Sequence, residues 1–166
     1  MELLDLVNMD DNVIGVTDKT QAHATGQIHR VAAVYVFDST GQLYVQVHKK
    51  GGGLYDNSVG GHVSQGETYG YAARREASEE LGITQKLYHI ATFYSDEGKL
   101  MQHMFGLYQC TAESSWTFTP NDEVEEIIPM SIGKINELMR TNPSKFTGGF
   151  KSTMRKYLQY RDQLLK

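Results

Sequence analysis

Three glutamates near the middle of the chain have the spacing of a metal-binding face. Glu76, Glu79 and Glu80 stand at positions i, i+3 and i+4, which in a helix of about 3.6 residues per turn places their carboxylates side by side. Like charges at this spacing repel each other, so the pattern calls for a compensating cation. Mg²⁺ prefers carboxylate oxygens and leaves positions for substrate phosphates. The three residues therefore predict a helix that presents a divalent metal site.

The surrounding residues indicate which elements position these carboxylates. We expect a helix over residues 68–81 with Gly82 as its C-terminal stop, because glycine readily adopts the left-handed conformation that ends helices. Before this helix, Gly60 and Gly61 allow the backbone to approach a ligand closely. A small apolar stripe beside the glutamate face lets the helix pack on a sheet while its acids line a groove. The stripe consists of Ala73, Ala77 and Leu81.

Segment 60–83 resembles the Nudix box, the signature of the Nudix hydrolases. Gly61 is followed after five residues by Glu67, and after seven more by the run REASEELGI, which begins at Arg75. Every fixed position of the motif is matched, although Ala77 is smaller than the aliphatic residue that the motif asks for. A run of helix charges is usually a solvated surface. Here the glycines and the arginine occur at the required spacing as well, which favours the box.

The resemblance implies an α/β/α sandwich with a mixed β-sheet and the hydrolysis of a diphosphate bond. The implied substrate is a nucleoside di- or triphosphate or a related nucleotide derivative, and the implied cofactor is Mg²⁺ or Mn²⁺. The implied metal ligands are Glu76, Glu79, Glu80 and the Gly61 carbonyl. Arg75 and Glu67 would form the supporting pair that orients the helix glutamates. A metal cluster suits this reaction because it neutralises phosphate charge and aims a water in line.

The general base and the substrate contacts stay open at this point. Glu79 or Glu80 could accept the proton of the attacking water, and the family also uses loop acids outside the box. The loop candidates here are Asp96, Glu97, Glu123 and Glu125. The substrate would lie over Gly60 and Gly61. The residues expected to reach its other end are Tyr55, with Phe93 or Tyr94, for stacking on a base, and Lys49 and Lys50 for phosphate.

A second resemblance, to isopentenyl-diphosphate isomerases of the same fold, runs through residues 5–130. On this resemblance His23, His29 and His62 occupy three metal-binding positions, and imidazoles from separate segments suit a transition metal. Two departures speak against the isomerase reaction. Gly60 stands where those enzymes have a reactive cysteine, and their two metal-binding glutamates would fall near Met101 and His103, which are not acids. His48, His89 and His103 are not singled out by any pattern.

Three functions are consistent with these two resemblances. The first is a metal-dependent hydrolase, the second an isopentenyl-diphosphate isomerase, and the third a non-catalytic Nudix-fold ligand sensor. The intact set of box glutamates favours the hydrolase, since sensor modules tend to lose those residues.

Composition limits the class of protein. The 166 residues fit one domain, 1–166, and 40% hydrophobic with 22% charged residues is typical of a globular protein. A net charge of −4 argues against a nucleic-acid partner. The single cysteine, Cys110, suits a reducing compartment and is expected in the core. With an acidic N-terminal segment and no apolar run of about 18 residues, we expect a cytoplasmic protein without a membrane partner. A homodimer is the default expectation.

Hydrophobic periodicity predicts the remaining elements. Residues 17–27 are expected to be mainly a connecting loop, and residues 49–57, with three consecutive glycines, to be irregular. Apolar residues at helical spacing predict a short helix around residues 135–139 and a longer C-terminal helix around residues 150–165. The expected strands are residues 3–7, 13–17, 28–38, 43–48, 58–63, 86–95, 100–111 and 124–132.

Overall fold

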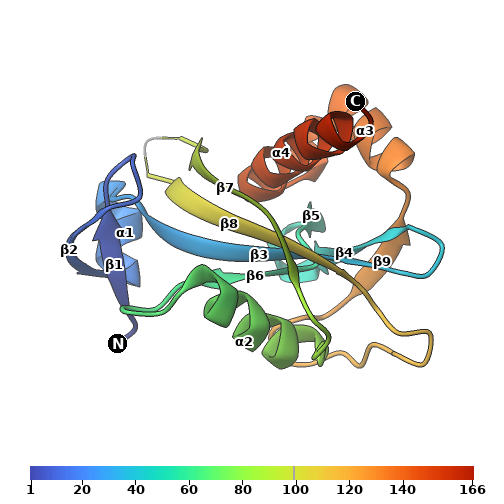
Figure 1. Ribbon diagram of the computed structural model, residues 1–166, viewed down its shortest axis with the longest axis horizontal. Coiled ribbons are helices and arrows are strands. Elements are labelled where there is room, and N and C mark those ends of the chain that lie inside the picture. Colours follow the sequence, from blue (N-terminus) through green and yellow to red (C-terminus); the bar gives the residue numbers. More distant parts are fainter. Residues whose placement is uncertain (99) are drawn as a thin grey trace.

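The computed structural model describes residues 1–98 and 100–166 as a mixed sheet with helices on both faces (Figure 1). This arrangement confirms the predicted α/β/α fold. The strands are β1 Leu3–Val7, β2 Val13–Asp18, β3 His29–Phe37, β4 Leu43–His48, β5 Leu54–Asp56, β6 Val59–His62, β7 Tyr88–Asp96, β8 Gln102–Thr111 and β9 Ile127–Met130. The helices are α1 Lys19–Thr25, α2 Tyr69–Leu81, α3 Ile132–Thr141 and α4 Gly148–Leu164, with short 3₁₀ turns at Lys49–Gly51 and Pro143–Lys145.

Strand β3 is the centre of the sheet. It pairs in parallel with β8 along its whole length, from His29 opposite His103 to Phe37 opposite Thr111. On its other side it pairs antiparallel with β6, where Ala32 lies opposite Gly61. Strands β1 and β4 each touch it at one end. Residues that lie far apart in the sequence therefore meet along β3.

The alternation of side chains along β3 divides the core into two layers. Tyr35 and Phe37 point to one face and pack with Phe150 and Met154 of α4. Val34 and Val36 point to the other face and pack with Ala73 of α2. Figure 1 shows α2 on one side of the sheet and α3 with α4 on the other. Because both faces are covered, β3 is almost wholly apolar and buried.

Helix α2 begins and ends where the sequence predicts. The Thr68 side chain accepts a hydrogen bond from the Tyr71 backbone N–H, which caps the first turn. Gly82 has φ 64°, the left-handed conformation that glycine adopts without strain, and its N–H donates to the Ser78 carbonyl. Its stripe residues Ala73, Ala77 and Leu81 are buried against the sheet. The glutamates are thereby placed at the sheet edge beside β6.

Two segments differ from the prediction. Residues Lys19–Thr25 form helix α1 and not a connecting loop, because Asp18 caps it by accepting from the Gln21 N–H and Gly26 ends it at φ 69°. The glycine-rich segment 49–57 contains strand β5, where Tyr55 pairs with Val47 of β4. Glycines 52 and 53 supply the positive φ angles that let the chain turn back onto β4.

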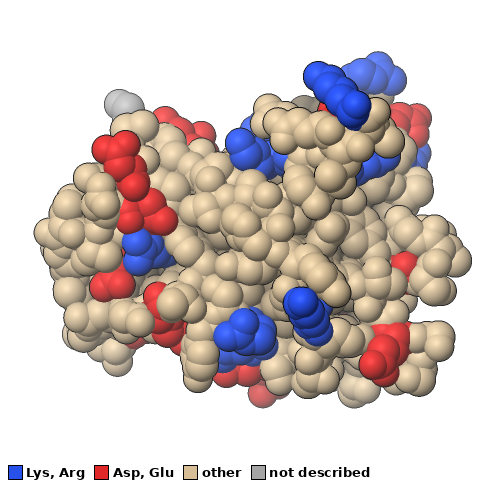
Figure 2. Space-filling view, viewed as in Figure 1, with Lys and Arg blue, Asp and Glu red and all other residues tan. Residues whose placement is uncertain are grey.

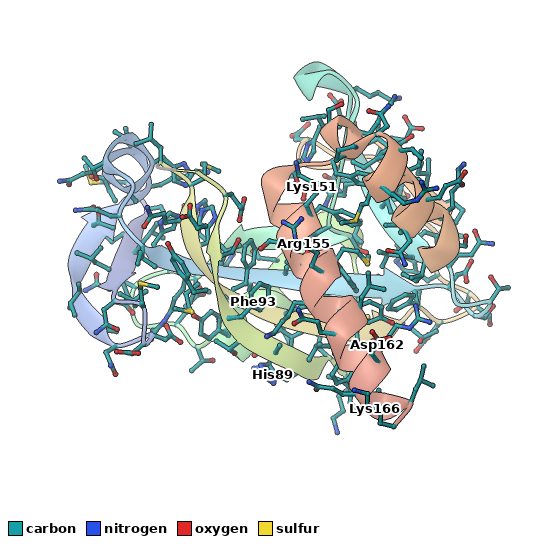
Figure 3. All side chains as sticks on the ribbon, turned by 90° about the horizontal axis from the view of Figure 1, so that it is seen from above. His89, Phe93, Lys151, Arg155, Asp162 and Lys166 are labelled. Atoms are coloured by element: carbon teal, nitrogen blue, oxygen red, sulfur yellow. The ribbon has the colours of Figure 1, made fainter. Side chains whose placement is uncertain are left out.

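Helix α4 closes the upper face of the sheet. Seen from above, it lies across the sheet with Lys151, Arg155 and Asp162 along its length and Phe93 of β7 beside it (Figure 3). The Lys156 ammonium stands 5.6 Å from the centre of the Phe93 ring. Leu165, expected to pack in this helix, follows its last turn and is exposed. Among the described residues, none of the helices combines the length and apolarity needed to cross a lipid bilayer.

Candidate active site

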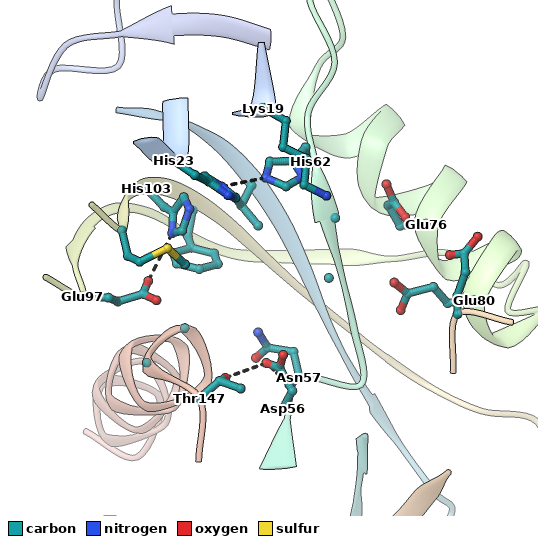
Figure 4. A pocket seen from close by; sticks show the side chains of 18 of the residues that line it. Lys19, His23, Asp56, Asn57, His62, Glu76, Glu80, Glu97, His103 and Thr147 are labelled. Carbon is teal, nitrogen blue, oxygen red and sulfur yellow. Dashed lines mark hydrogen bonds and ion pairs between the residues drawn. The ribbon is translucent and has the colours of Figure 1, made fainter. Parts of the chain in front are cut away.

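A cavity of about 680 Å³ opens between α2, β6, β8 and the first turn of α4. Figure 4 shows histidine side chains on one side of it and the α2 glutamates on the other. Asp56, the last residue of β5, and Asn57, which follows it, line the cavity between these two groups (Figure 4). The cavity thus joins the two groups of residues that the sequence singles out.

The acidic side of the cavity brings Glu76 and Glu80 together with Glu123. One carboxylate oxygen from each lies within 4.8 Å of the others. Glu76 and Glu80 are buried on the inner face of α2, whereas Glu123 comes from the loop before β9. Glu79 also lines the cavity, but its side chain is 51% exposed and lies 3.4 Å from Arg75. Two of the three helix glutamates expected to bind metal, Glu76 and Glu80, therefore lie close together. The third member of the group is the loop residue Glu123 and not Glu79.

Arg75 links the residues on the acidic side of the cavity through hydrogen bonds. Its Nε and Nη2 donate to the two carboxylate oxygens of Glu67, both at 3.0 Å. Its Nη1 donates to Glu76 at 2.6 Å, and Nη2 also donates to the His62 carbonyl at 3.1 Å. The hydrogen bonds to Glu67 raise the pKa of Arg75, and the same bonds lower the pKa of Glu67. Both groups are thus charged at neutral pH, and they fix the Glu76 carboxylate against β6.

Gly61 leaves room for Glu76. A Cβ built on Gly61 would overlap the Glu76 carboxyl group, so a larger residue there would displace that side chain. A Cβ on the neighbouring Gly60 would meet nothing within 4 Å. The two glycines therefore differ. Gly61 provides the space that the Glu76 carboxyl group occupies, whereas no side chain packs against Gly60.

The electrostatics of the acidic group suit a divalent cation. Burial raises the pKa of Glu80 to about 8, although Gln46 Nε2 donates to it at 2.7 Å. Burial also raises the pKa of Glu76, against the opposing effect of Arg75. Carboxyl groups held this close in a buried place are costly as anions unless a cation joins them. Their oxygen donors fit Mg²⁺ or Mn²⁺.

The cavity as a whole carries an excess of acids. Among the described lining residues, Lys19 is the only lysine or arginine. The acids that line it are Glu2, Asp56, Glu76, Glu79, Glu80, Glu97 and Glu123. A phosphorylated ligand would meet strong repulsion here without a bound cation.

On the opposite side, the three histidines noted in the sequence converge. His23 Nε2 lies 3.2 Å from His29 Nε2 and 3.4 Å from His62 Nε2. Burial lowers the pKa of His29 to about 4 and that of His62 to about 3, so both are neutral at pH 7. His103 joins them, with its ring centre 4.7 Å from that of His29. Sequence reasoning missed His103, because its place depends on the pairing of β8 with β3.

Other candidate residues lie away from the cavity. Tyr55 packs on Phe146 at 5.5 Å between ring centres, and Phe93 stacks on Phe105 at 5.7 Å, so both belong to the core beneath α4. The expectation that Tyr55 binds substrate has no support from its position. Lys49 and Lys50 form ion pairs with Glu126 and Glu125 outside the cavity. Of the four loop acids considered as bases, Glu97 and Glu123 line the cavity, and Asp96 and Glu125 do not. Cys110 is buried in β8, as expected.

Comparison with known families agrees with this geometry. The family model of the NUDIX domain matches residues 27–147, which include β6 with Gly61 and the whole of α2. The chain belongs to the Nudix family. Proteins of this family generally use a divalent metal and act on small phosphorylated molecules.

Similar Nudix proteins carry two kinds of name. A protein of Serratia proteamaculans named isopentenyl-diphosphate Δ-isomerase is 31% identical, over 93% of this chain and 90% of its own length. A Nudix hydrolase of Deinococcus radiodurans is 34% identical, over 73% of this chain and 74% of its own. The crystal structure of a Deinococcus radiodurans protein superimposes with a TM-score of 0.69 at 29% identity, covering 85% of this chain and 90% of that one. The fold is thus shared with the crystal structure, and the names of the two relatives divide between isomerase and hydrolase.

Proposed function

We propose that this Nudix protein hydrolyses a diphosphate bond in a nucleoside di- or triphosphate or a related nucleotide derivative, with Mg²⁺ or Mn²⁺. The observation that carries the proposal is the acidic group of Glu76, Glu80 and Glu123, with Arg75 and Glu67 fixing Glu76 and with Gly61 leaving room for it. This arrangement supplies anionic oxygens on one wall of an open cavity. Such oxygens can hold the divalent cation that neutralises the charge of a diphosphate during hydrolysis.

Each residue has a distinct part in the proposed reaction. When bound, the divalent ion would neutralise phosphate oxygens and lower the pKa of a water. Glu76 and Glu80 would hold it, with Glu123 and the Gly61 carbonyl as further oxygen donors. Glu79 is the base that we favour, because it is the most exposed of the helix acids and is held only by a 3.4 Å contact to Arg75. Glu80 is buried and hydrogen-bonded to Gln46, which suits a ligand better than a proton acceptor.

Isopentenyl-diphosphate isomerisation is the second candidate. It is favoured by the relatives of that name, which reach 31% identity over most of the chain. It is opposed by Gly60, which has no side chain to move a proton to or from carbon. Cys110, the one cysteine, lies in β8 and does not line the cavity. A non-catalytic ligand sensor is the third candidate, and the complete set of box glutamates speaks against it.

A substrate panel tests the proposal. The protein is incubated with nucleoside triphosphates, dinucleotides, nucleotide sugars and isopentenyl diphosphate, with Mg²⁺ or Mn²⁺ present, and the products are identified by chromatography. We expect release of phosphate or of a nucleoside monophosphate from at least one nucleotide. Turnover of isopentenyl diphosphate alone would favour the isomerase, and binding without turnover would favour the sensor.

Two variants make the test specific to the site. Glu80→Gln and Glu79→Gln remove a ligand and the proposed base, and each should lower the hydrolysis rate by roughly 100-fold or more while the fold is retained. Hydrolysis at the wild-type rate in both variants would rule out the proposed metal site. Gly60→Cys supplies the missing thiol in open space. A gain of isomerisation in that variant would show that Gly60 is what separates this chain from the isomerase reaction.

We further infer that the whole chain acts as one domain on a small phosphorylated substrate in the cytoplasm, without a nucleic-acid or membrane partner. The net charge of −4 supports this inference. Figure 2 is consistent with it, since acidic and basic side chains form small separate groups on a mostly uncharged face. A homodimer stays a prediction, which sedimentation of the purified protein would test.

A further inference from the structure

The loop between β8 and β9 passes the C-terminal end of α2 and is bonded to it (Figure 1). Trp116 Nε1 donates to the Leu81 carbonyl at 2.9 Å, and Asn121 Nδ2 donates to the Glu80 carbonyl at 2.8 Å. The last carbonyl groups of a helix have no partner within the helix, so these two side chains satisfy acceptors that would otherwise need water. The loop is therefore attached to the part of α2 that carries Glu80.

Asn121 also fixes the backbone of Glu123. Its side-chain Oδ1 accepts from the backbone N–H of Glu123 at 2.9 Å and from that of Val124 at 2.8 Å. Its own backbone N–H donates to the Val124 carbonyl at 3.0 Å, which closes residues 121–124 into a tight turn. Val124 is buried in the core layer that α2 covers, and this anchors the turn. One side chain thus joins the backbone of Glu80 to the backbone of Glu123.

The partners of the Asn121 amide determine its orientation. A carbonyl oxygen only accepts a hydrogen bond and a backbone N–H only donates one. The amide nitrogen must therefore face Glu80 and the amide oxygen must face Glu123, since the opposite orientation would break all three bonds. The position requires a donor for the helix and an acceptor for the turn in one short side chain. Serine supplies an acceptor for such a turn, but its single hydroxyl is too short to reach the helix as well.

Repulsion within the acidic group acts mainly on its loop member. Glu76 and Glu80 are buried on α2, whereas Glu123 is exposed on a loop, and one carboxylate oxygen from each lies within 4.8 Å of the others. Like charges at this distance repel each other, and the loop acid is the one that can move into solvent. The hydrogen bonds of Asn121 oppose this movement because they fix the backbone of Glu123 relative to the helix. A ligand that is already in place loses less entropy when a cation binds.

We propose that Asn121 is a positioning residue of the acidic site, which holds Glu123 in place relative to Glu80 so that a loop acid and a helix acid bind the same divalent cation. Asn121 itself does not line the cavity, so it acts through Glu123. Partners of this kind, which orient a metal ligand without touching the metal, commonly change metal affinity when they are replaced. The inference rests on the metal site of the proposed function and does not depend on which bond is hydrolysed.

Binding of Mn²⁺ to the full chain, without any substrate, tests the proposal. The paramagnetic resonance signal of free Mn²⁺ falls as the ion binds, so the readout does not require catalysis. Asn121→Ser keeps an acceptor for the turn and removes the donor to Glu80, and it should weaken Mn²⁺ binding about 10-fold. Trp116→Phe is the matched control, because it removes the neighbouring bond to Leu81 and keeps an aromatic ring to pack on Tyr44. It should bind Mn²⁺ as the wild type does. Wild-type affinity in Asn121→Ser, or equal losses in both variants, would overturn the proposal.

A double-mutant cycle tests whether Asn121 acts through Glu123. Glu123→Gln removes the acid and should also weaken Mn²⁺ binding about 10-fold. Adding Asn121→Ser to Glu123→Gln should then cause little further loss, whereas two independent effects would multiply to about 100-fold. The multiplied loss would overturn the proposal, and so would wild-type binding in Glu123→Gln. Asn121 is exposed and serine is common in turns, so the variants should fold, which circular dichroism verifies.

Glu80→Gln separates this inference from the proposed function. Weaker Mn²⁺ binding in Glu80→Gln together with wild-type binding in Asn121→Ser would refute the role of Asn121 and keep the metal site. Wild-type binding in Glu80→Gln as well would refute both. A protein that binds Mn²⁺ as expected in every variant but hydrolyses no substrate would refute the proposed hydrolysis and support the role of Asn121.

Discussion

At the scale of single residues, the acidic site depends on a glycine as much as on its glutamates. Gly61 has no Cβ, and the Glu76 carboxyl group occupies the space that a Cβ would need. On the other side, Arg75 Nη1 donates a hydrogen bond to the Glu76 carboxylate at 2.6 Å. Glu76 is thus confined to one position between β6 and α2, and a ligand that is fixed in advance loses little entropy when a metal binds.

Gly61→Ala should therefore damage catalysis more than folding. The added methyl group displaces the Glu76 carboxyl, so we expect the hydrolysis rate to fall roughly 100-fold, in line with a catalytic group moved by about 1 Å. Steady-state kinetics at saturating Mg²⁺ measure this effect. The matched variant Gly60→Ala adds the same methyl group to the next residue, where it meets nothing within 4 Å, and should keep near wild-type activity. Equal losses in the two variants would contradict this role of Gly61.

Glu80 should make the metal-free protein less stable as the pH rises. Burial raises its pKa to about 8 from an ordinary value of 4.5, so the folded state holds a proton that the unfolded state has released. Stability from this group is therefore complete below pH 4.5 and is lost as the pH approaches 8. At pH 6.5 the unfolded histidines are still about half protonated, and they lose this charge by pH 8. Because Glu80→Gln keeps the same histidines, the difference between the variant and the wild type isolates the effect of Glu80.

Thermal denaturation in chelator at pH 6.5 and pH 8 measures this dependence. We expect the melting temperature of the metal-free wild type to fall across the interval and that of Glu80→Gln to fall less. Mg²⁺ should reduce the loss in the wild type, because a bound cation stabilises the anionic carboxylate. An identical pH response in the wild type and Glu80→Gln would show that another group is responsible.

At the scale of elements, α4 stabilises the sheet and shapes one end of the cavity. Met154 is fully buried beneath it, and the Thr147 hydroxyl at its start donates to Asp56 in the cavity at 2.9 Å. The buried Thr153 hydroxyl donates to Asn57 Oδ1 at 2.7 Å and also contacts the Tyr35 hydroxyl. The helix thus fixes the two polar residues that lie between the acids and the histidines.

Met154→Ala should lower the free energy of unfolding by about 2–5 kcal/mol, the usual cost of a cavity in a well-packed core. Chemical denaturation gives the value directly. Arg155→Ala changes the next residue of the same helix, whose side chain is exposed, and should change stability by less than about 0.5 kcal/mol. Similar losses for both variants would mean that α4 is held by something other than its buried face.

The sequence is sufficient for elements whose signals are local. Helix α2 is predicted well because its cap, its stop and its glutamate spacing all lie within fifteen residues. Helix α1 was wrongly expected to be mainly loop, since its seven residues have a single buried side chain, Ala22, and so no periodic stripe. The Asp18 cap and Gly26 are the signals that would have found it. The sequence does not predict strand β5 because its three residues, which follow three glycines, are too few to show an alternating pattern. Only its pairing with β4 defines it.

At the scale of the whole molecule, the cavity collects charge from segments that the sequence keeps far apart. Glu123 joins Glu76 and Glu80 across more than forty residues, and His103 joins His29 across more than seventy. The pairing of β3 with β8 brings His103 to its place, and sequence patterns do not fix strand register between distant segments. The sequence offers four loop acids as candidate bases without distinguishing them. The fold shows that two of these, Glu97 and Glu123, line the cavity.

The acid excess in the cavity makes binding of the substrate conditional on metal. A single like-charge contact at 4 Å costs about 1 kcal/mol even in water, and more near a protein surface. Two or more such contacts with a diphosphate imply an affinity loss of roughly 100-fold when the cation is removed. Calorimetric titration of a non-hydrolysable nucleotide analogue, with and without Mg²⁺, measures it. Affinity that is independent of Mg²⁺ would place the diphosphate away from the α2 acids.

Arg75 forms hydrogen bonds on both sides of the cavity and so provides a physical link between them. Its guanidinium contacts Glu76 in the acidic group and also donates to the backbone carbonyl of His62, whose ring belongs to the histidine group. An ion bound by Glu76 would share that carboxylate with Arg75 and thereby alter the hydrogen bond from Arg75 to the His62 carbonyl. Any such coupling is reciprocal: the factor by which a cation at the acids changes the affinity for a ligand beside the histidines must equal the factor by which that ligand changes the affinity for the cation. One arginine would make the two sides of the cavity a thermodynamically linked pair.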